Sequence, residues 1–223
     1  MSALAKSCAW TTSCVRKLRL SLKLALCQKV LAHLGDGVYI HPSVTFNWPE
    51  RIHVSDGCRL HQGAILNART SHDVGIMLGK GVTIHEYTYV DPYGGWIRIE
   101  EGAGIGHHCV VGGHGGLTIG RHTMISGLTY IVPANHIFQR LDVPYLQQGE
   151  TRQGIVIGNN VWIGAGCIIL DGVTIGDNCV VGAGSIVTRS LPACVLAYGA
   201  PAKVMTCLSE RGDTSAGDTE VDT

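Results

Sequence analysis

Aromatic side chains are scarce in this chain, and so is charge. Only two Phe occur among 223 residues, and aromatic residues make up 6% of the sequence. Thirty Gly stand beside them, so the chain has many sites for tight corners and few bulky rings. This length accommodates one domain with flanking segments. The composition therefore favours a fold of many corners around a narrow core.

An excess of charge of either sign is also missing. Seventeen basic residues balance seventeen acidic ones, so the formal net charge is zero. Proteins that bind nucleic acid usually carry a basic face, because the phosphate backbone dominates their affinity. We therefore expect no nucleic-acid partner.

Long uninterrupted hydrophobic runs are missing as well. The apolar stretch at residues 15–26 is interrupted by four basic residues, which excludes a bilayer-spanning helix, and it lacks a clear signal-peptide cleavage pattern. We expect residues 1–36 to form an amphipathic helical segment. Two roles stay open for it: a cap on the first layer of the fold, or a surface helix that contacts anionic lipid. The expected location is the cytoplasm, with peripheral contact at the inner membrane surface as the alternative.

What the chain does have is a repeat of six residues. An aliphatic residue recurs at every sixth position from Ile157 to Val187, and only Gly or Asn stands three residues after each one up to Val181. A period of six is neither helical nor that of an alternating strand. It is typical of a parallel β-helix built from hexapeptides, with a left-handed backbone conformation at each corner.

The repeat predicts which side chains touch. With three hexapeptides per coil, each aliphatic residue stacks on the one eighteen positions later, so Ile157 should lie on Ile175 and Ile163 on Val181. The same six-residue step can be traced upstream from Val54, with interruptions at residues 91–95 and 115–116. We therefore expect an all-β solenoid domain over residues 37–205 and a disordered polar tail over 206–223.

Nine cysteines give an odd count, which argues against a complete disulfide framework. Four of them fall on the small inward position of the repeat: Cys58, Cys109, Cys167 and Cys179. We interpret these as reduced packing residues, as in a cytosolic protein.

The repeat disappears between residues 132 and 154. A long excursion from a regular solenoid is where function is usually found. It contains His136, and an imidazole is well suited to remove a proton from a hydroxyl near neutral pH. A carboxylate on the other ring nitrogen would orient the base, and both Glu150 and Asp142 are candidates for that role.

Four segments, at residues 154–166, 172–178, 181–189 and 199–204, resemble the hexapeptide-repeat acyltransferases, most closely the maltose, galactoside and polysaccharide O-acetyltransferase branch. Residues 154–166 read Gly-Ile-Val-Ile-Gly-Asn-Asn-Val-Trp-Ile-Gly-Ala-Gly, and residues 199–204 read Gly-Ala-Pro-Ala-Lys-Val. The resemblance implies a left-handed parallel β-helix and a homotrimer with active sites between neighbouring subunits. It also implies acetyl-CoA as the co-substrate, no metal, and a sugar or glycan acceptor. By this resemblance His136 is the general base and transfer is direct, without an acyl-enzyme.

The same resemblance assigns residues to the donor. Trp162 matches the family's Trp near the pantetheine arm and acceptor. The other matching positions, for the pantetheine and the nucleotide end, are Ala165, Ala183, Thr188, Arg189 and Lys203. The two basic residues offer positive charge to phosphates.

The acceptor side departs from the family. An Asn-Phe-Asn turn of some sugar acetyltransferases aligns with residues 106–108, which read Gly-His-His, and an acceptor-contacting Asp aligns with His114. The candidate acceptor-binding residues are therefore Asn135, His107 and His114, and the resemblance does not identify the sugar.

Three other functions remain open at this stage. The same base could serve the N-acetylation of an amino sugar. A γ-carbonic-anhydrase-like zinc enzyme would use the histidines near 107–122, although three of them, His108, His114 and His122, are expected at left-handed corners that point outward. A scaffold with a decayed site is the third alternative.

Overall fold

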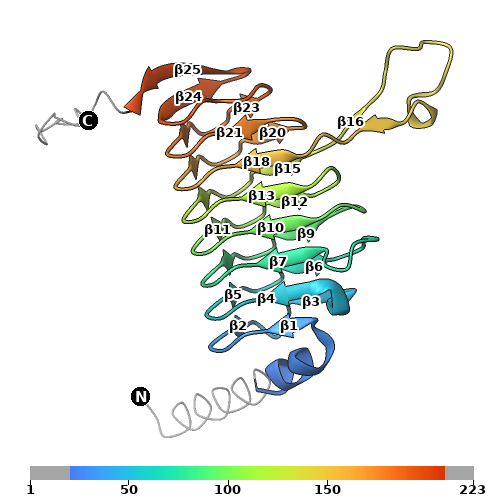
Figure 1. The fold of residues 1–223 in the computed structure, drawn as a ribbon, viewed down its shortest axis with the longest axis vertical. Coiled ribbons are helices and arrows are strands. Elements are labelled where there is room, and N and C mark those ends of the chain that lie inside the picture. Colours follow the sequence, from blue (N-terminus) through green and yellow to red (C-terminus); the bar gives the residue numbers. More distant parts are fainter. Residues whose placement is uncertain (1–20, 209–223) are drawn as a thin grey trace, which may run out of the picture.

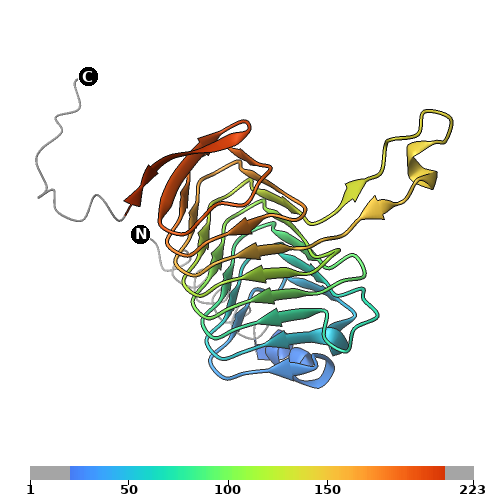
Figure 2. The same cartoon turned by 45° about the horizontal axis from the view of Figure 1, so that its top comes forward.

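The computed structural model describes residues 21–208, and they form a solenoid of three sheets wound around one axis, in which successive coils pair in parallel (Figures 1 and 2). Sheet A contains β1 (His33–Leu34), β4 (Ile52–Val54), β7 (Ile76–Leu78), β10 (Ile97–Ile99), β13 (Leu117–Ile119), β18 (Ile155–Ile157) and β21 (Thr174–Ile175). Sheet B contains β2 (Tyr39–Ile40), β5 (Arg59–Leu60), β8 (Thr83–Ile84), β11 (Gly104–Ile105), β14 (Met124–Ile125), β19 (Trp162–Ile163), β22 (Val180–Val181), β24 (Val195–Gly199) and β25 (Ala202–Cys207). Sheet C contains β3 (Thr45–Asn47), β6 (Ile65–Asn67), β9 (Tyr89–Asp91), β12 (Val110–Gly112), β15 (Tyr130–Val132), β20 (Ile168–Leu170) and β23 (Ile186–Val187). The all-β solenoid is confirmed, and its left-handedness stays a prediction.

The predicted stacking register is also confirmed. Ile157 pairs with Ile175, and Ile163 pairs with Val181. Where the repeat is interrupted the register still holds, since Ile125 pairs with Ile163 on the next coil. The chain therefore returns to the same column after the excursion.

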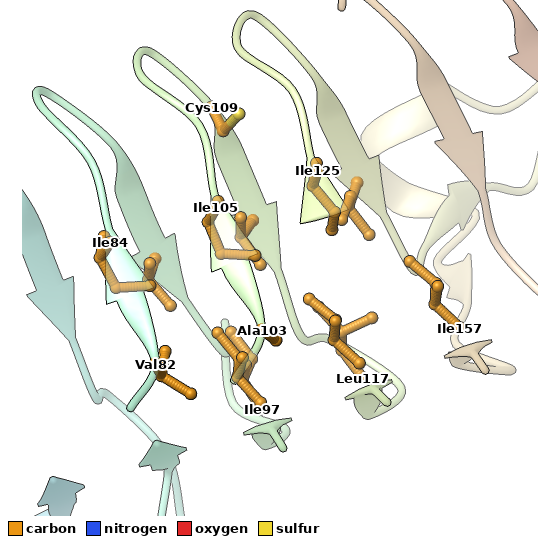
Figure 3. Packing of buried hydrophobic residues seen from close by; sticks show 14 of the residues in the cluster. Val82, Ile84, Ile97, Ala103, Ile105, Cys109, Leu117, Ile125 and Ile157 are labelled. Atoms are coloured by element: carbon orange, nitrogen blue, oxygen red, sulfur yellow. The ribbon is translucent and has the colours of Figure 1, made fainter. Parts of the chain in front are cut away.

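The core consists of the inward aliphatic side chains of all three sheets. Ile84, Ile105 and Ile125 come from successive strands of sheet B and lie one above the next (Figure 3). Each is at most 1% exposed. The four cysteines assigned to inward positions are buried, and each of them is a free thiol. Stacked side chains at strand spacing make one continuous apolar column.

The corners adopt the expected left-handed conformation. Asn160, Gly166 and Gly184 have φ values of 52°, 68° and 70°. His108 and His122 also have positive φ, but His114 does not, so the prediction for His114 was wrong. The residue-115 interruption moves the corner to Gly116, whose φ is 99°. An added Cβ there would lie 2.8 Å from the Trp96 ring, which requires glycine.

The ends of the solenoid differ slightly from the predicted boundaries. Residues 21–30 are helical, and β1 already pairs with β4, so the coils begin before residue 37. At the other end β25 continues to Cys207, inside the predicted tail. The predicted helix over 1–20 and the tail over 209–223 lie outside the described residues. Within the described part, no helix is long and apolar enough to cross a bilayer.

Two glycines allow a matched test of the corners. An added Cβ would meet no atom within 4 Å at Gly81 or at Gly104, but only Gly81 has a positive φ, of 66°. Gly81→Ala should therefore lower the free energy of unfolding by about 1–2 kcal/mol, the cost of a left-handed L-residue. Gly104→Ala should leave it unchanged or raise it slightly. Urea unfolding midpoints measure both, and equal shifts would contradict the assigned corner conformation.

Candidate active site

The excursion forms an arm, residues 133–154, that projects from the solenoid between β15 and β18 (Figures 1 and 2). Its stalk is the antiparallel pair β16 (Asn135–His136) and β17 (Glu150–Thr151). The Ile137 N–H donates to the Gly149 carbonyl at 3.0 Å, and a 3₁₀ turn, η2 (Tyr145–Gln147), lies near the tip. The arm is therefore an ordered hairpin that holds its side chains away from the core.

His136 and Glu150 are brought together by this hairpin. They are directly opposite residues in the β16–β17 register, and His136 is exposed. The Glu150 carboxylate accepts hydrogen bonds from the Arg152 guanidinium. The hydrogen bond from Arg152 is the main reason that the pKa of Glu150 lies below its ordinary value, and the charges of His114 and His136 lower it further by smaller amounts. Glu150 is therefore an anion beside the imidazole near neutral pH.

Asp142, the other candidate partner, lies elsewhere on the arm. Its carboxylate pairs with the Arg140 guanidinium at 2.5 Å, and this pairing lowers the pKa of Asp142. Arg140 and Asp142 are both exposed. The structure therefore places Glu150 and not Asp142 opposite His136.

A polar network near Glu150 was missed by the sequence reasoning. The Tyr93 ring stacks on His114 with ring centroids 4.4 Å apart. The Asp91 carboxylate is 1% exposed and accepts hydrogen bonds from the Tyr93 N–H and the Tyr89 hydroxyl, each at 2.7 Å. Burial, together with this bond to Asp91, raises the pKa of Tyr89 to about 12. The sequence signals for this network were the interruption at residues 91–95 and the alignment of His114 with an acceptor-contacting position.

His114 is the member of this network that faces the charges of the arm. Its Nδ1 atom is buried and has no hydrogen-bond partner. Burial lowers the pKa of His114, while the charge of Glu150 acts in the opposite direction. His114 is therefore a neutral imidazole near pH 7. Asn135, next to His136 on β16, is exposed.

The residues matched to the donor are divided between sheet B and sheet C. Trp162 points outward from β19, is 49% exposed, and its Nε1–H donates to the Ser126 hydroxyl at 3.4 Å. Ala165 and Ala183 are exposed corner residues on successive coils, where the Gly184 N–H donates to the Ala165 carbonyl at 2.8 Å. Thr188 and Arg189 are exposed and follow β23 of sheet C, and Lys203 is exposed on β25 of sheet B.

Within one subunit, the candidate base His136 and the candidate donor-site residue Trp162 do not lie on the same side of the solenoid. The arm leaves where sheets C and A meet, on the side of the solenoid away from β11 (Figure 1). Trp162 belongs to the same sheet as β11, because β19 pairs with β14 and β14 with β11. His136 and Trp162 therefore lie on different sides of the same subunit.

The histidines of the zinc alternative do not converge. His107 and His108 are neighbours with ring centroids 5.8 Å apart, and His108 stacks on Tyr87 at 5.2 Å. Within residues 21–208, no three His, Cys, Asp or Glu side chains are placed to hold a metal ion. The alternative therefore finds no ligand set in this part of the chain.

Comparison with known proteins gives consistent relatives. The family described as Bacterial transferase hexapeptide (six repeats) matches residues 154–189. Nodulation protein L of Rhizobium meliloti is 41% identical over 129 residues, which cover 57% of this chain and 68% of that protein. A Mycobacterium tuberculosis protein whose name gives it as an acetyltransferase is 29% identical over 128 residues, and the match spans 57% of this chain but only 43% of its length.

The fold is shared with solved structures. An N-acyltransferase from Bacillus cereus, solved with an amino-sugar nucleotide and coenzyme A, superimposes with a TM-score of 0.60 at 20% identity, covering 83% of this chain and 88% of that one. This likeness concerns the fold alone. The family match, the extent of identity with nodulation protein L and the six-residue register together show that the chain belongs to the hexapeptide-repeat family of bacterial transferases.

Proposed function

We propose that this protein transfers the acetyl group of acetyl-CoA to a hydroxyl of a sugar, a polysaccharide or a glycosylated acceptor. The observation that carries the proposal is the His136–Glu150 pair on the arm of a hexapeptide-repeat transferase. A neutral imidazole removes a proton from a hydroxyl, and a neighbouring carboxylate stabilises the imidazolium that forms. The acetyltransferase name of the Mycobacterium tuberculosis relative supports transfer of an acetyl group.

In the proposed step, His136 accepts the hydroxyl proton while the acceptor oxygen attacks the thioester carbonyl. The carbon–sulfur bond then breaks, the CoA thiolate leaves, and the imidazolium returns the proton to sulfur. Glu150 is suited to orient His136 because its depressed pKa keeps it anionic. Burial raises the pKa of the thiols of Cys109 and Cys167, which makes them poor nucleophiles and favours direct transfer.

Acetyl-CoA is proposed to lie along sheet B toward the C-terminal end. Trp162 would contact the thioester end of the donor. The backbone of Ala165 and Ala183 would form hydrogen bonds with the pantetheine. Thr188, Arg189 and Lys203 would lie near the nucleotide phosphates. These residues are exposed; Trp162 and Ala165 lie on one coil and Ala183 on the next, whereas Thr188 and Arg189 follow β23 of sheet C. Arg and Lys offer charge-assisted hydrogen bonds to phosphate oxygens.

A homotrimer is proposed because one chain leaves the site incomplete. His136 and Trp162 lie on different sides of one subunit, so the base must come from a neighbouring copy if both serve one reaction. The arm tip also carries exposed apolar side chains: Phe138 at 68%, Leu141 at 91% and Leu146 at 87% exposure. Such a cluster suits burial against another subunit.

Loss of the base gives the first test of this function. His136→Ala should lower kcat at least ~10²-fold, the scale of general-base catalysis, with the Kd of acetyl-CoA unchanged. Glu150→Gln should lower kcat less, because the imidazole remains. The control is His72→Ala, which removes an exposed imidazole from a loop that the proposal does not use. Release of free CoA measures the rate, and near-normal turnover by His136→Ala would contradict the mechanism.

The donor assignment predicts a different kinetic change. Arg189→Ala and Lys203→Ala should raise the KM for acetyl-CoA, by up to about tenfold for a lost charge-assisted contact, with little change in kcat. Neither should change the KM for S-acetylpantetheine, which lacks the nucleotide. Lys80→Ala, an exposed lysine on an N-terminal coil, is the matched control. If both substitutions raised the KM for acetyl-CoA and for S-acetylpantetheine equally, Arg189 and Lys203 would not contact the nucleotide end of the donor.

Mixed trimers test the shared site directly. His136→Ala and Trp162→Ala chains, each weakly active alone, should regain activity when coexpressed with different tags and purified as mixed assemblies. If the site combines two subunits, every mixed trimer contains an intact combination, whereas a site within one chain would stay damaged in all of them. CoA release by the mixed species, compared with the two parents, distinguishes these outcomes.

A further inference from the structure

The outer face of sheet B has a groove whose lining contains none of the residues assigned to acetyl-CoA. It has a volume of about 560 Å³ and lies over β8, β11 and β14. Small-ligand sites usually have volumes of roughly 300–1,000 Å³, so this groove is large enough for a small molecule. The side chains and backbone that define it belong to Thr83, His85, Gly104, His107, Met124 and Ser126.

The depth of the groove comes from Gly104. Along the outward column of sheet B, Gly104 stands between Thr83 and Met124 in register. Its φ is not in the left-handed region, and an added Cβ would meet no atom within 4 Å. The backbone does not require glycine at this position. The missing side chain instead leaves a depression that any larger residue would fill.

The groove also lies beside the proposed thioester position. Met124 pairs with Trp162 across β14 and β19, and the Trp162 Nε1–H donates to Ser126, which lines the groove. The residues assigned to acetyl-CoA run from Trp162 toward the C-terminal end, whereas the groove extends from it toward the N-terminal end. An acceptor in the groove would thus meet the acetyl end of the donor without competing for the same surface.

The chemistry of the groove is polar and without fixed charge. Of the described residues that line it, none is Asp, Glu, Lys or Arg. Its side-chain hydrogen-bonding groups are the imidazoles of His85, His107 and His122 and hydroxyls such as that of Ser126. The Nδ1 of His85 lies 3.7 Å from a Glu86 carboxylate oxygen, which helps to orient that ring. Such groups match hydroxyls, which both donate and accept, while Met124 offers an apolar wall to a sugar face.

We propose that this groove binds an uncharged glycosyl unit of the acceptor, and that Gly104 sets the size of the sugar it admits. This inference rests on the proposed function and names the acceptor class: a neutral glycoside, in preference to a phosphorylated or nucleotide-linked sugar. Phosphate recognition commonly uses Arg or Lys, and the groove lining has neither.

The test places a bulky side chain at Gly104, where the groove is deepest. Gly104→Phe should lower kcat/KM for a neutral disaccharide, with maltose as the probe, at least ~10-fold, whereas Gly104→Ala should lower it far less. The Kd of acetyl-CoA should be unchanged in both variants. Arg98→Phe is the matched control, because it adds the same ring to an exposed position of sheet A on the same coil. Ser126→Ala, which removes only one hydroxyl, is the second variant.

Binding measured without turnover separates this inference from the proposed reaction. Saturation-transfer NMR of the full chain with maltose, methyl glucoside and glucose 6-phosphate should show the neutral sugars bound to the unmodified protein and to Arg98→Phe, and lost in Gly104→Phe. That pattern supports the groove even if no acetyl transfer is detected. Acetylation that is unaffected by Gly104→Phe would overturn the groove and leave the reaction standing. Binding of glucose 6-phosphate alone, or of none of the three sugars, would also overturn the groove.

Discussion

The structure depends on one contact, the stacking of each inward aliphatic side chain on its equivalent in the next coil. Ile157 on Ile175 and Ile163 on Val181 are two examples, and backbone hydrogen bonds between the same strands hold the register. Because the stacking is one-dimensional, each coil is stabilised by its two neighbours and not by a distant core. Residues on the outer surface are consequently presented at fixed intervals.

This regularity explains why so much of the fold could be predicted. The inward column and most corners follow from local rules, since Gly and Asn tolerate the left-handed backbone better than other residues do. Tyr87 and Leu128 adopt the same conformation, at φ values of 56° and 62°, with no local sequence signal. His114 was assigned to a corner wrongly because the slip at residues 115–116 displaced the corner by two positions.

The candidate site was less predictable, because it depends on contacts that cross the repeat. The sequence singled out His136 as the only histidine of the excursion, and it offered Glu150, with Asp142 as the alternative, as the partner. The hairpin register places Glu150 opposite His136, and residue spacing alone does not reveal that register. The network of Asp91, Tyr93 and His114 joins an insertion to another coil, so neither segment reveals it alone. The groove over Gly104 likewise depends on Thr83 and Met124, which flank Gly104 on the neighbouring strands.

The C-terminal end of the solenoid has a consequence for solution behaviour. A stack of parallel strands exposes unpaired backbone groups on its last coil, and these could template further coils from other molecules. Here β24 pairs in parallel with β22 on one side and antiparallel with β25 on the other. Because β25 runs antiparallel to the other strands of sheet B, it does not present the strand direction that a further parallel coil from another molecule would need. End-to-end growth into fibres through sheet B is thereby disfavoured at this end.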